Sequence, residues 1–411
     1  MARARPKRGA ASSTLRRVIT FRPLVLYGLG VIVGAGIYVA LGEVIARAGP
    51  AAPFSFVLAG ISAALTGLCY AELASRFPES AGAAAYVEIG FESRFMGALA
   101  GAAVTVTVAI TTASIARGSV VYLRELWPIP DAVLIIGVIA AFTALAISSV
   151  RIAVGFAGLI GAVEIGGLIA VVIAGLMRAP EYHFANMLPA TLTQARGVVA
   201  GSFIAFFAFV GFETLTNMAE EVEDPSRTVP RGIVTAIAAS VALYSAVATA
   251  TVLSDVEGRN PLLRLFSGSA ARLFASAAFF AVANGVLVQI VMLARLFYGM
   301  ARRRQLPGFL GTVSSLTQTP IPASLVAGGV VLFVALAVPF ERLLVISNAL
   351  ILLVFALVDL SLLRIHRRLQ KSSAFIAPAW APPSAALVSI LMVVAEILNQ
   401  ISSALHLGGS Y

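Results

Sequence analysis

Flexible glycine backbone and isolated carboxylates lie inside long apolar segments of this chain, and both could carry chemistry there. Gly34, Ala35 and Gly36 occur together near the middle of the apolar segment 24–46. Each glycine costs a helix about 1 kcal/mol relative to alanine, so this backbone is easy to unwind. Unwound backbone at membrane depth is tolerated only where protein covers it or where it lines a cavity. The stretch therefore predicts a break within a membrane helix.

The apolar segments 198–219 and 154–177 each contain a carboxylate. Gly211 lies inside the first of them and Glu213 follows it, while Glu164 lies in the middle of the second. A carboxylate at this depth costs about 2.5–3.5 kcal/mol on insertion scales and is a functional candidate by default. We interpret Glu164 and Glu213 as gating or coupling residues. The alternatives are that Glu213 faces a water-filled vestibule or pairs with an arginine, and that Glu164 is a structural residue bonded to a neighbouring helix.

Membrane helices are the elements that must position these groups. Of the 411 residues, 59% are hydrophobic and only 12% are charged, which is about half the charged fraction of a soluble domain. The apolar residues form blocks of about 20 residues, the length that crosses a bilayer, without the alternation of a membrane barrel. Eleven such segments are expected, at residues 24–46, 53–75, 96–123, 132–149, 154–177, 198–219, 231–253, 271–300, 322–339, 343–365 and 384–400. The sequence thus predicts an all-α integral membrane protein with about eleven transmembrane helices.

The distribution of Lys and Arg predicts the orientation. Seven basic residues and no acidic residue precede the first segment, and further basic clusters fall on the same side at 302–304 and 364–371. Because such residues concentrate on the cytoplasmic side, we expect residues 1–22 to be a basic cytoplasmic tail of a multi-pass protein in the cell's inner (plasma) membrane. The apolar stretch after this tail is longer than that of a signal peptide, so we expect it to be retained. The net charge of +10 does not indicate nucleic-acid binding, since the basic residues are not interleaved with aromatic ones.

The first segment, which carries Gly34 and Gly36, and the sixth, which carries Gly211, are five apart in the series. Discontinuous spans at equivalent positions of two halves are typical of transporters built from inverted five-helix repeats. This spacing predicts one repeat at residues 23–177 and a second at 198–366. Residues 367–411 would then form an additional C-terminal helix and tail.

Four stretches of sequence resemble the amino acid–polyamine–organocation transporter superfamily, and they occur in the family's order. "VGAGIYVALG" (33–42) is similar to its first-helix signature, and "CYAELASRFPESAGAAAYV" (69–87) to its second helix and following loop. "FFAFVGFETLTNMAEEVEDPSRTVPRGI" (206–233) resembles its sixth helix and the loop after it. "ARLFYGMARRRQLPGFL" (294–310) resembles its eighth helix and extension. The resemblance implies a LeuT-like fold of five plus five inverted helices, with helices one and six broken midway.

The resemblance also implies a role for each break. Backbone amides of Gly34, Ala35 and Gly36, at the positive end of a half-helix, would bind a substrate carboxylate. Backbone carbonyls of Phe209, Val210 and Gly211 would accept hydrogen bonds from its α-ammonium group. Phe207 matches the position of a gating aromatic in related exchangers, with core packing as the alternative. The expected substrate-binding residues are Gly34, Ala35, Gly36, Ile37, Phe207, Phe209, Val210 and Gly211.

The coupling ion is predicted from two positions at which this sequence departs from the pattern of known members of the superfamily. In some proton-coupled members of the superfamily a lysine occupies the position of Glu164 and stands in for a sodium ion. A carboxylate departs from that pattern, so we expect Glu164 to take up and release a proton during the cycle. In sodium-dependent relatives the eighth helix supplies paired hydroxyls, whereas "SAAFFAVANGVLVQ" has no adjacent Ser/Thr pair near its centre. Protons, or exchange, are favoured over sodium.

Other classes of function fit less well. The three histidines and one cysteine are scattered, so we expect no catalytic residue, metal or cofactor and no enzyme activity. A channel would show repeated pore loops or rings of charge, and the sequence shows neither pattern.

We expect a secondary transporter with an amino acid or small organic amine, protons and membrane lipids as partners. A polyamine- or ethanolamine-type carrier and a transport-defective nutrient sensor stay open as alternatives. The aromatic residues Phe206, Phe207, Phe209 and Phe212 favour a neutral substrate side chain.

Overall fold

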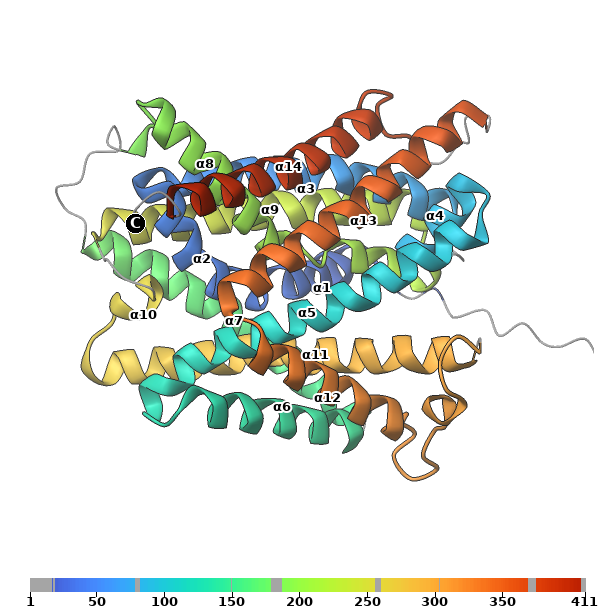
Figure 1. The fold of residues 1–411 in the computed structure, drawn as a ribbon, viewed down its shortest axis with the longest axis horizontal. Helices are drawn as coiled ribbons and strands as arrows, with labels where there is room; N and C mark the ends of the chain where they lie inside the picture. The colour runs from blue at the N-terminus through green and yellow to red at the C-terminus, as the bar shows by residue number, and fades with distance from the viewer. Residues whose placement is uncertain are drawn as a thin grey trace, which may run out of the picture.

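The computed structural model describes residues 17, 19–77, 82–148, 150–178, 187–255, 260–302, 304–368 and 375–407, with backbone only for 150–162, 217, 220 and 403–407, and forms a helical bundle (Figure 1). Apart from an isolated parallel bridge between Ile19 and Val222, these residues contain no strand. The helices are α1 (Phe21–Val33), α2 (Ala35–Ala48), η1 (Gly49–Ala51), α3 (Ala52–Arg76), α4 (Ala83–Phe91), α5 (Arg94–Leu126), α6 (Asp131–Ser148), α7 (Val150–Met177), α8 (Leu192–Ala205), η3 (Phe206–Phe209), η4 (Phe212–Glu221), α9 (Pro225–Leu253), α10 (Pro261–Arg264), α11 (Gly268–Arg302), η5 (Gly308–Gly311), α12 (Ile321–Ala337), α13 (Phe340–Arg368) and α14 (Ala381–Leu407). Most of the predicted N-terminal tail lies outside the described residues.

The helices coincide with the apolar segments expected from the sequence. Among the described residues, eight helical stretches are long and apolar enough to cross a membrane, one of which runs from Ala35 to Arg76 through α2, η1 and α3. The described residues also contain three shorter apolar helices, Phe21–Val33, Val163–Met177 and Ile321–Ala337. The prediction of an all-helical membrane protein is therefore confirmed. The count of eleven spans and the two inverted repeats stay predictions.

The breaks expected in the first and sixth segments are both present. α1 ends at Val33 and α2 begins at Ala35, with Gly34 between them at φ −36° and ψ −139°. In the sixth segment α8 ends at Ala205, and η3, an extended Val210 and η4 follow in place of a regular α-helix. Each break leaves backbone groups without helical partners in the middle of an apolar segment.

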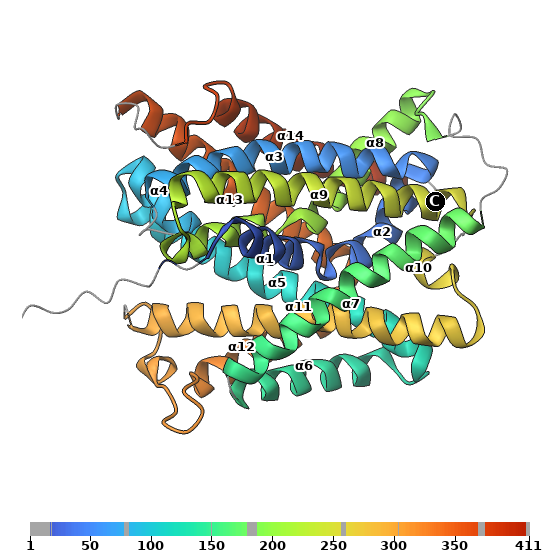
Figure 2. The same cartoon turned by 180° about the vertical axis from the view of Figure 1, so that it is seen from behind.

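Glycine allows the long helices behind the breaks to pack closely. α3 lies along α9, and α5 along α11 (Figures 1 and 2). A Cβ on Gly60 of α3 would clash with Val241, and one on Gly67 would lie 2.7 Å from Cδ1 of Ile237. Small residues let membrane helices approach in this way. The pair α3–α9 thus forms a tightly packed support for the broken segments.

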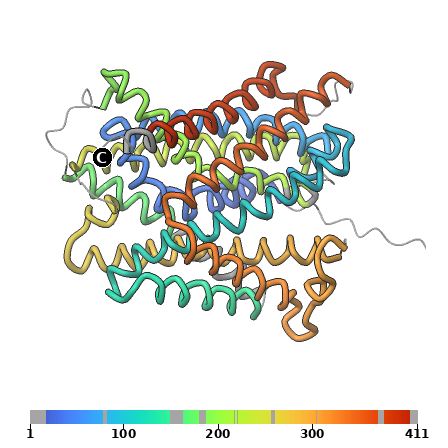
Figure 3. The backbone as a smooth tube through the Cα atoms, in the orientation of Figure 1, coloured from blue at the N-terminus to red at the C-terminus, as the bar shows by residue number. Residues whose placement is uncertain are grey.

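The last helix, α14, packs on α13, α3 and α8 (Figure 3). Oε2 of Glu396 on this helix accepts from a guanidinium nitrogen of Arg47, near the end of α2, at 2.7 Å. A helix expected to lie outside the ten-segment core is therefore bonded to the first broken segment.

Candidate functional site

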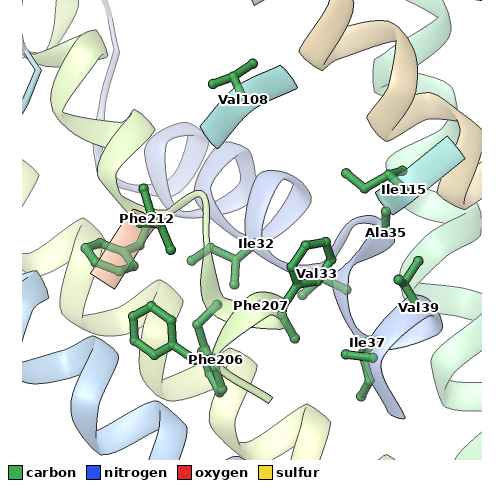
Figure 4. Close-up of a cluster of buried hydrophobic side chains, with 14 of the residues drawn as sticks. Ile32, Val33, Ala35, Ile37, Val39, Val108, Ile115, Phe206, Phe207 and Phe212 are labelled. Atoms are coloured by element: carbon green, nitrogen blue, oxygen red, sulfur yellow. The ribbon is translucent and has the colours of Figure 1, made fainter. Parts of the chain in front are cut away.

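The two breaks lie directly against each other, with buried side chains around their contact (Figure 4). A Cβ on Gly36 would lie 2.6 Å from Cα of Ala208, so the backbones of α2 and η3 touch. Gly211 has a φ of +125°, and a Cβ there would lie 2.9 Å from Cγ1 of Val31. Glycine is the residue that permits both the close approach and this φ without strain. The glycines that predicted the breaks are thus also the residues that bring them together.

Tyr244 of α9 joins the two breaks. Its hydroxyl lies 2.6 Å from the carbonyl oxygen of Ile32, in the last turn of α1, and 3.0 Å from that of Ala208 in η3. The Tyr244 ring packs edge-on against Phe209, with 5.2 Å between ring centroids. A buried carbonyl left unsatisfied costs about 1–3 kcal/mol, so this hydroxyl stabilises the broken conformation.

Several backbone groups at the breaks remain able to bind a ligand. The first amides of α2 have no partner within that helix, and Gly34 contributes no side-chain cap. In the described structure, no hydrogen bond outside α2 is found for the amides of Ala35, Gly36 and Ile37. The Gly211 carbonyl, by contrast, already accepts from the Thr214 amide at 3.0 Å and from its hydroxyl at 2.6 Å. Of the three carbonyls predicted to bind the α-ammonium group, those of Phe209 and Val210 are therefore more available than that of Gly211.

Glu164 lies beside the first break. It is 1% exposed, and its Oε2 is 4.0 Å from the position that a Cβ on Gly34 would take. Neither carboxylate oxygen has a hydrogen-bond partner among the described residues, although the Asn284 side chain of α11 is close enough to interact. The backbone carbonyl of Glu164 accepts from the Tyr38 hydroxyl at 2.8 Å. The predicted coupling residue thus lies within reach of the predicted carboxylate-binding amides.

Glu213 has a local partner. Its Oε2 accepts from the amide of Gly211 at 2.8 Å, at the start of η4. A carboxylate is stabilised at this end of a helix by the backbone dipoles. The side chain is half-buried, and no salt bridge to an arginine is found for it in the described part of the chain. Glu213 therefore stabilises the backbone at the sixth-segment break through its bond to the Gly211 amide.

Three of the four aromatic residues expected near the pocket are used in packing. Phe206 packs on Phe355 and Phe209 on Tyr244, while Phe212 contacts Phe355 at 5.2 Å between ring centroids. All are fully buried. They form the core behind the breaks, which weakens the argument from these residues for a neutral substrate side chain.

Phe207 lies at the contact between the two breaks. It is 3% exposed and lies beside Val33 at the end of α1, with Ala35 and Ile37 in the first turn of α2 (Figure 4). This position fits either the predicted gating role or core packing.

A cavity of about 460 Å³ opens between α2, α5, α6, α10 and α13. Tyr38 is its lining residue nearest in sequence to Gly34, about 6 Å further along the helix. The rings of Tyr38, Tyr122 and Phe274 pack on one another, with centroids 6.2–6.5 Å apart. Because Tyr38 also bonds to Glu164, it separates this cavity from the first break. Sequence reasoning missed Tyr38, Tyr122 and Tyr244, whose only signal was a hydroxyl-bearing ring in an apolar segment.

The cavity lining carries more acidic than basic side chains. Four carboxylates and two guanidinium groups line it, namely Glu43, Glu125, Asp131, Glu341, Arg117 and Arg124. Arg117 donates to the carbonyls of Ala335 and Val338 at 2.7 and 3.1 Å, and Arg124 pairs with Asp131 at 3.3 Å. The four carboxylates outnumber the two guanidinium groups, and this net negative charge favours positively charged solutes in the cavity.

The remaining polar residues of the spans have mostly structural partners. Asn348 donates to the carbonyl of Phe203 at 2.7 Å and so acts between helices. Thr111 bonds to Ser347 across α5 and α13. Among the described residues no group of three or more His, Cys, Asp or Glu could hold a metal ion. Asp359 meets the criterion that singled out Glu164, a carboxylate in an apolar segment, and was missed.

Two interrupted membrane helices that face each other in an all-helical bundle are the arrangement of a secondary transporter. The family model for amino acid permeases matches residues 19–406, and the chain belongs to this family. The resemblance to the amino acid–polyamine–organocation superfamily is thereby confirmed.

Individual relatives extend this assignment. The chain is 30% identical over 382 residues to cationic amino acid transporter 3, mitochondrial, of Arabidopsis thaliana, which covers 85% of this chain and 62% of the relative. It is 30% identical over 347 residues to cationic amino acid transporter 4, vacuolar, of the same plant, covering 76% and 57%. A methylthioribose transporter of Bacillus subtilis is 27% identical over 370 residues, covering 79% and 77%. The chain thus spans less than two thirds of the length of the plant relatives.

Proposed function

We propose that this protein is a secondary active transporter that moves amino acids across the membrane by alternating access. The contact between the two breaks carries this proposal. Amides at the start of α2 would bind the substrate carboxylate, and the carbonyls of Phe209 and Val210 would bind its α-ammonium group. Phe207, between the two breaks, would close over the substrate.

Glu164 is the proposed coupling residue, in proton symport or in exchange. Its buried carboxylate lacks a hydrogen-bond partner among the described residues and adjoins Gly34. A buried carboxylate is costly when charged and much less so when protonated. Protonation of Glu164 would therefore change the charge beside the bound substrate and link the two binding events.

The orientation and architecture complete the proposal. The concentration of basic residues supports a cytoplasmic N-terminus in the plasma membrane. The cavity at Tyr38 would then open to the outside. Eleven spans, the first ten in two inverted repeats, are consistent with the helix order.

Cationic amino acids are the substrates to test first. The cavity lining has four carboxylates and two guanidinium groups, and the plant relatives are named as cationic amino acid transporters. Amine transport of the polyamine or ethanolamine type is the alternative that the same acidic cavity favours.

The test is uptake into proteoliposomes with labelled lysine, arginine, leucine, putrescine, ethanolamine and methylthioribose. Each solute is offered under a pH gradient, under a sodium gradient, and with unlabelled solute inside. Accumulation of lysine or arginine driven by the pH gradient is the expected result. Accumulation driven only by sodium would refute proton coupling. Failure of all solutes, even with unlabelled solute inside, would contradict transport and favour the sensor.

The charge of the cavity is tested separately with Glu125→Gln. This change should lower kcat/KM for lysine at low ionic strength but leave leucine unaffected. The difference should shrink at physiological salt, where the screening length is about 8 Å. Glu88→Gln, at an exposed position of α4 outside the cavity, is the matched control. Equal effects on lysine and leucine would argue against selection by charge.

A further inference from the structure

Tyr38 of α2 separates the acidic cavity from the first break. It is 6% exposed, lines the cavity and lies one helical turn from Gly34. A substrate that enters from the cavity must pass this ring to reach the amides at the start of α2. A carrier that works by alternating access needs a barrier on each side of its binding site. The proposed substrate site has no residue assigned to the barrier towards the cavity.

The Tyr38 hydroxyl is held by α7. It donates to the backbone carbonyl oxygen of Glu164 at 2.8 Å, in a buried contact. A Cβ on Gly167, further along α7, would lie 2.5 Å from the hydroxyl oxygen. The hydroxyl therefore occupies space that glycine at this position leaves free. A Cβ on the neighbouring Gly166 would meet no atom within 4 Å, so position 166 places no such demand.

Aromatic rings from three helices pack together at this level. The Tyr38 ring lies 6.2 Å from that of Tyr122 on α5 and 6.4 Å from that of Phe274 on α11, measured between centroids. Phe266, which follows α10, stacks on Phe274 at 4.5 Å. Rings at these separations are in edge-to-face or offset contact. Because Tyr38, Tyr122 and Phe274 are all buried, they form an apolar layer between the cavity and the first break.

The backbone of α2 is fixed at this layer, whereas the Tyr38 side chain has room to move. The Tyr122 hydroxyl donates to the backbone carbonyl of Tyr38 at 2.8 Å. A Cβ on Gly118 of α5 would lie 2.5 Å from Cγ2 of Val39, so the two helices touch. On its other side the Tyr38 side chain adjoins a cavity of about 460 Å³. A rotamer change costs less than the repacking of a close-packed helix, so the ring is the part that can turn into the cavity.

We propose that Tyr38 is the gate between the acidic cavity and the substrate site. With its hydroxyl bonded to α7, the ring blocks the passage. In the open state the ring turns into the cavity and its hydroxyl bonds to water. Glu164 supplies both the carbonyl that holds the gate and the carboxylate proposed to bind the proton, so α7 joins the gate to the coupling site. This inference rests on the proposed transport through the cavity.

A cysteine placed behind the gate reports its opening. A Cβ on Gly285 of α11 would lie 3.2 Å from Cβ of Ala35 and 3.3 Å from Cγ2 of Ile115, so Ile115 of α5 adjoins the first break. Ile115 is 6% exposed and does not line the cavity. Ile115→Cys is made together with Cys69→Ala, which removes the one native cysteine. Val121→Cys, in the cavity lining, is the reference made in the same way.

The probe is a membrane-impermeant methanethiosulfonate, applied from the side of the membrane at which it labels Val121→Cys. Tyr38→Phe removes the bond to α7 but keeps the ring, and Gly167→Ala displaces the hydroxyl but keeps Tyr38. Each should raise the labelling rate of Ile115→Cys about 2- to 10-fold, the range that corresponds to the net contribution of one hydrogen bond. Gly166→Ala is the matched control and should leave this rate unchanged.

Two further thiols separate opening of the gate from general loosening of the fold. Val121→Cys should be labelled at the same rate with every gate variant. The native Cys69, 0% exposed on α3, should also keep its rate in the parent chain. An unchanged rate for Ile115→Cys without the Tyr38 hydroxyl, or equal increases with the two glycine variants, would overturn the proposal. An equal increase at Cys69 would overturn it as well, because a loosened fold would then explain the labelling.

The gate also predicts a change in apparent affinity. When the binding-competent state is a minor population, the apparent dissociation constant falls in proportion to the gain in that population. Tyr38→Phe should therefore lower KM about 2- to 10-fold for the best-exchanged amino acid, offered on the cavity side. A higher KM, as a merely structural loss would give, would contradict the gate. Labelling needs no transported solute, so a wild type that exchanges no solute would refute the proposed function while the labelling rates still decide on the gate.

Discussion

The hydroxyl of Tyr244 lies 2.6 Å from the carbonyl oxygen of Ile32 and so bonds the middle of α9 to the broken end of α1. The two residues are 212 positions apart in the chain. The same hydroxyl reaches Ala208 at 3.0 Å. One side chain of a well-packed helix thus lies within hydrogen-bond distance of carbonyls from both breaks and shares its single proton between them, which couples their conformations.

Tyr244→Phe keeps the ring but removes both contacts. We expect the free energy of unfolding to fall by about 1–3 kcal/mol, since the buried carbonyls of Ile32 and Ala208 lose the donor that they share. Amino acid counterflow should fall as well, because the two breaks are no longer held together. Thermal unfolding in detergent and counterflow in proteoliposomes measure the two effects. Tyr298→Phe is the control, since no partner is found for that hydroxyl in the described structure. Equal effects of the two changes would show that the bond to Ile32 is unimportant.

Gly36→Ala and Gly211→Ala should abolish counterflow. The added methyl group would meet Ala208 in the first case and Val31 in the second, where φ is also +125°. The expected cost in stability is about 1–3 kcal/mol for the strained backbone. Gly30→Ala, on the same broken segment as Gly36, meets no atom within 4 Å and should transport normally. Normal counterflow by Gly36→Ala would mean that the breaks need not touch.

Glu164→Gln removes the proposed proton-binding group while keeping its size. Counterflow should survive, whereas accumulation driven by a pH gradient should be lost and the pH dependence of uptake flattened. Paired assays in the same vesicles separate the two activities, with Glu88→Gln as the control. Full concentrative uptake with unchanged pH dependence would remove Glu164 from the mechanism.

The pair Arg47–Glu396 tests whether α14 supports the first broken segment. Glu396→Gln should lower the free energy of unfolding by about 1–3 kcal/mol, because Arg47 loses a charge-assisted bond. The double change Arg47→Met and Glu396→Gln should cost less than the sum of the single changes, by about 0.5–3 kcal/mol. Thermal unfolding of all four proteins gives this coupling energy. Strict additivity would mean that the contact contributes nothing.

The break at Gly34 could be predicted because unwinding depends on local residue type, and the break near Gly211 was implied by the resemblance to the superfamily. Their positions needed no knowledge of any neighbour. The role of the aromatic residues could not be predicted in the same way. Phe206, Phe209 and Phe212 are equally apolar whether they line a pocket or pack behind it, and only their partners on α3, α9 and α13 decide between the two.

By itself the sequence determined an all-helical membrane protein with two interrupted segments and a buried carboxylate at position 164. These features follow from the length of apolar blocks and from single residues, which are properties of contiguous chain. Only the tertiary structure decided that the breaks touch, that Tyr244 joins them, and that Glu213 is bonded within its own break. It also brought Asp359 to Thr66, 293 positions away. A buried polar group must find its partner in space, and a linear pattern of apolar residues does not specify which helix supplies it.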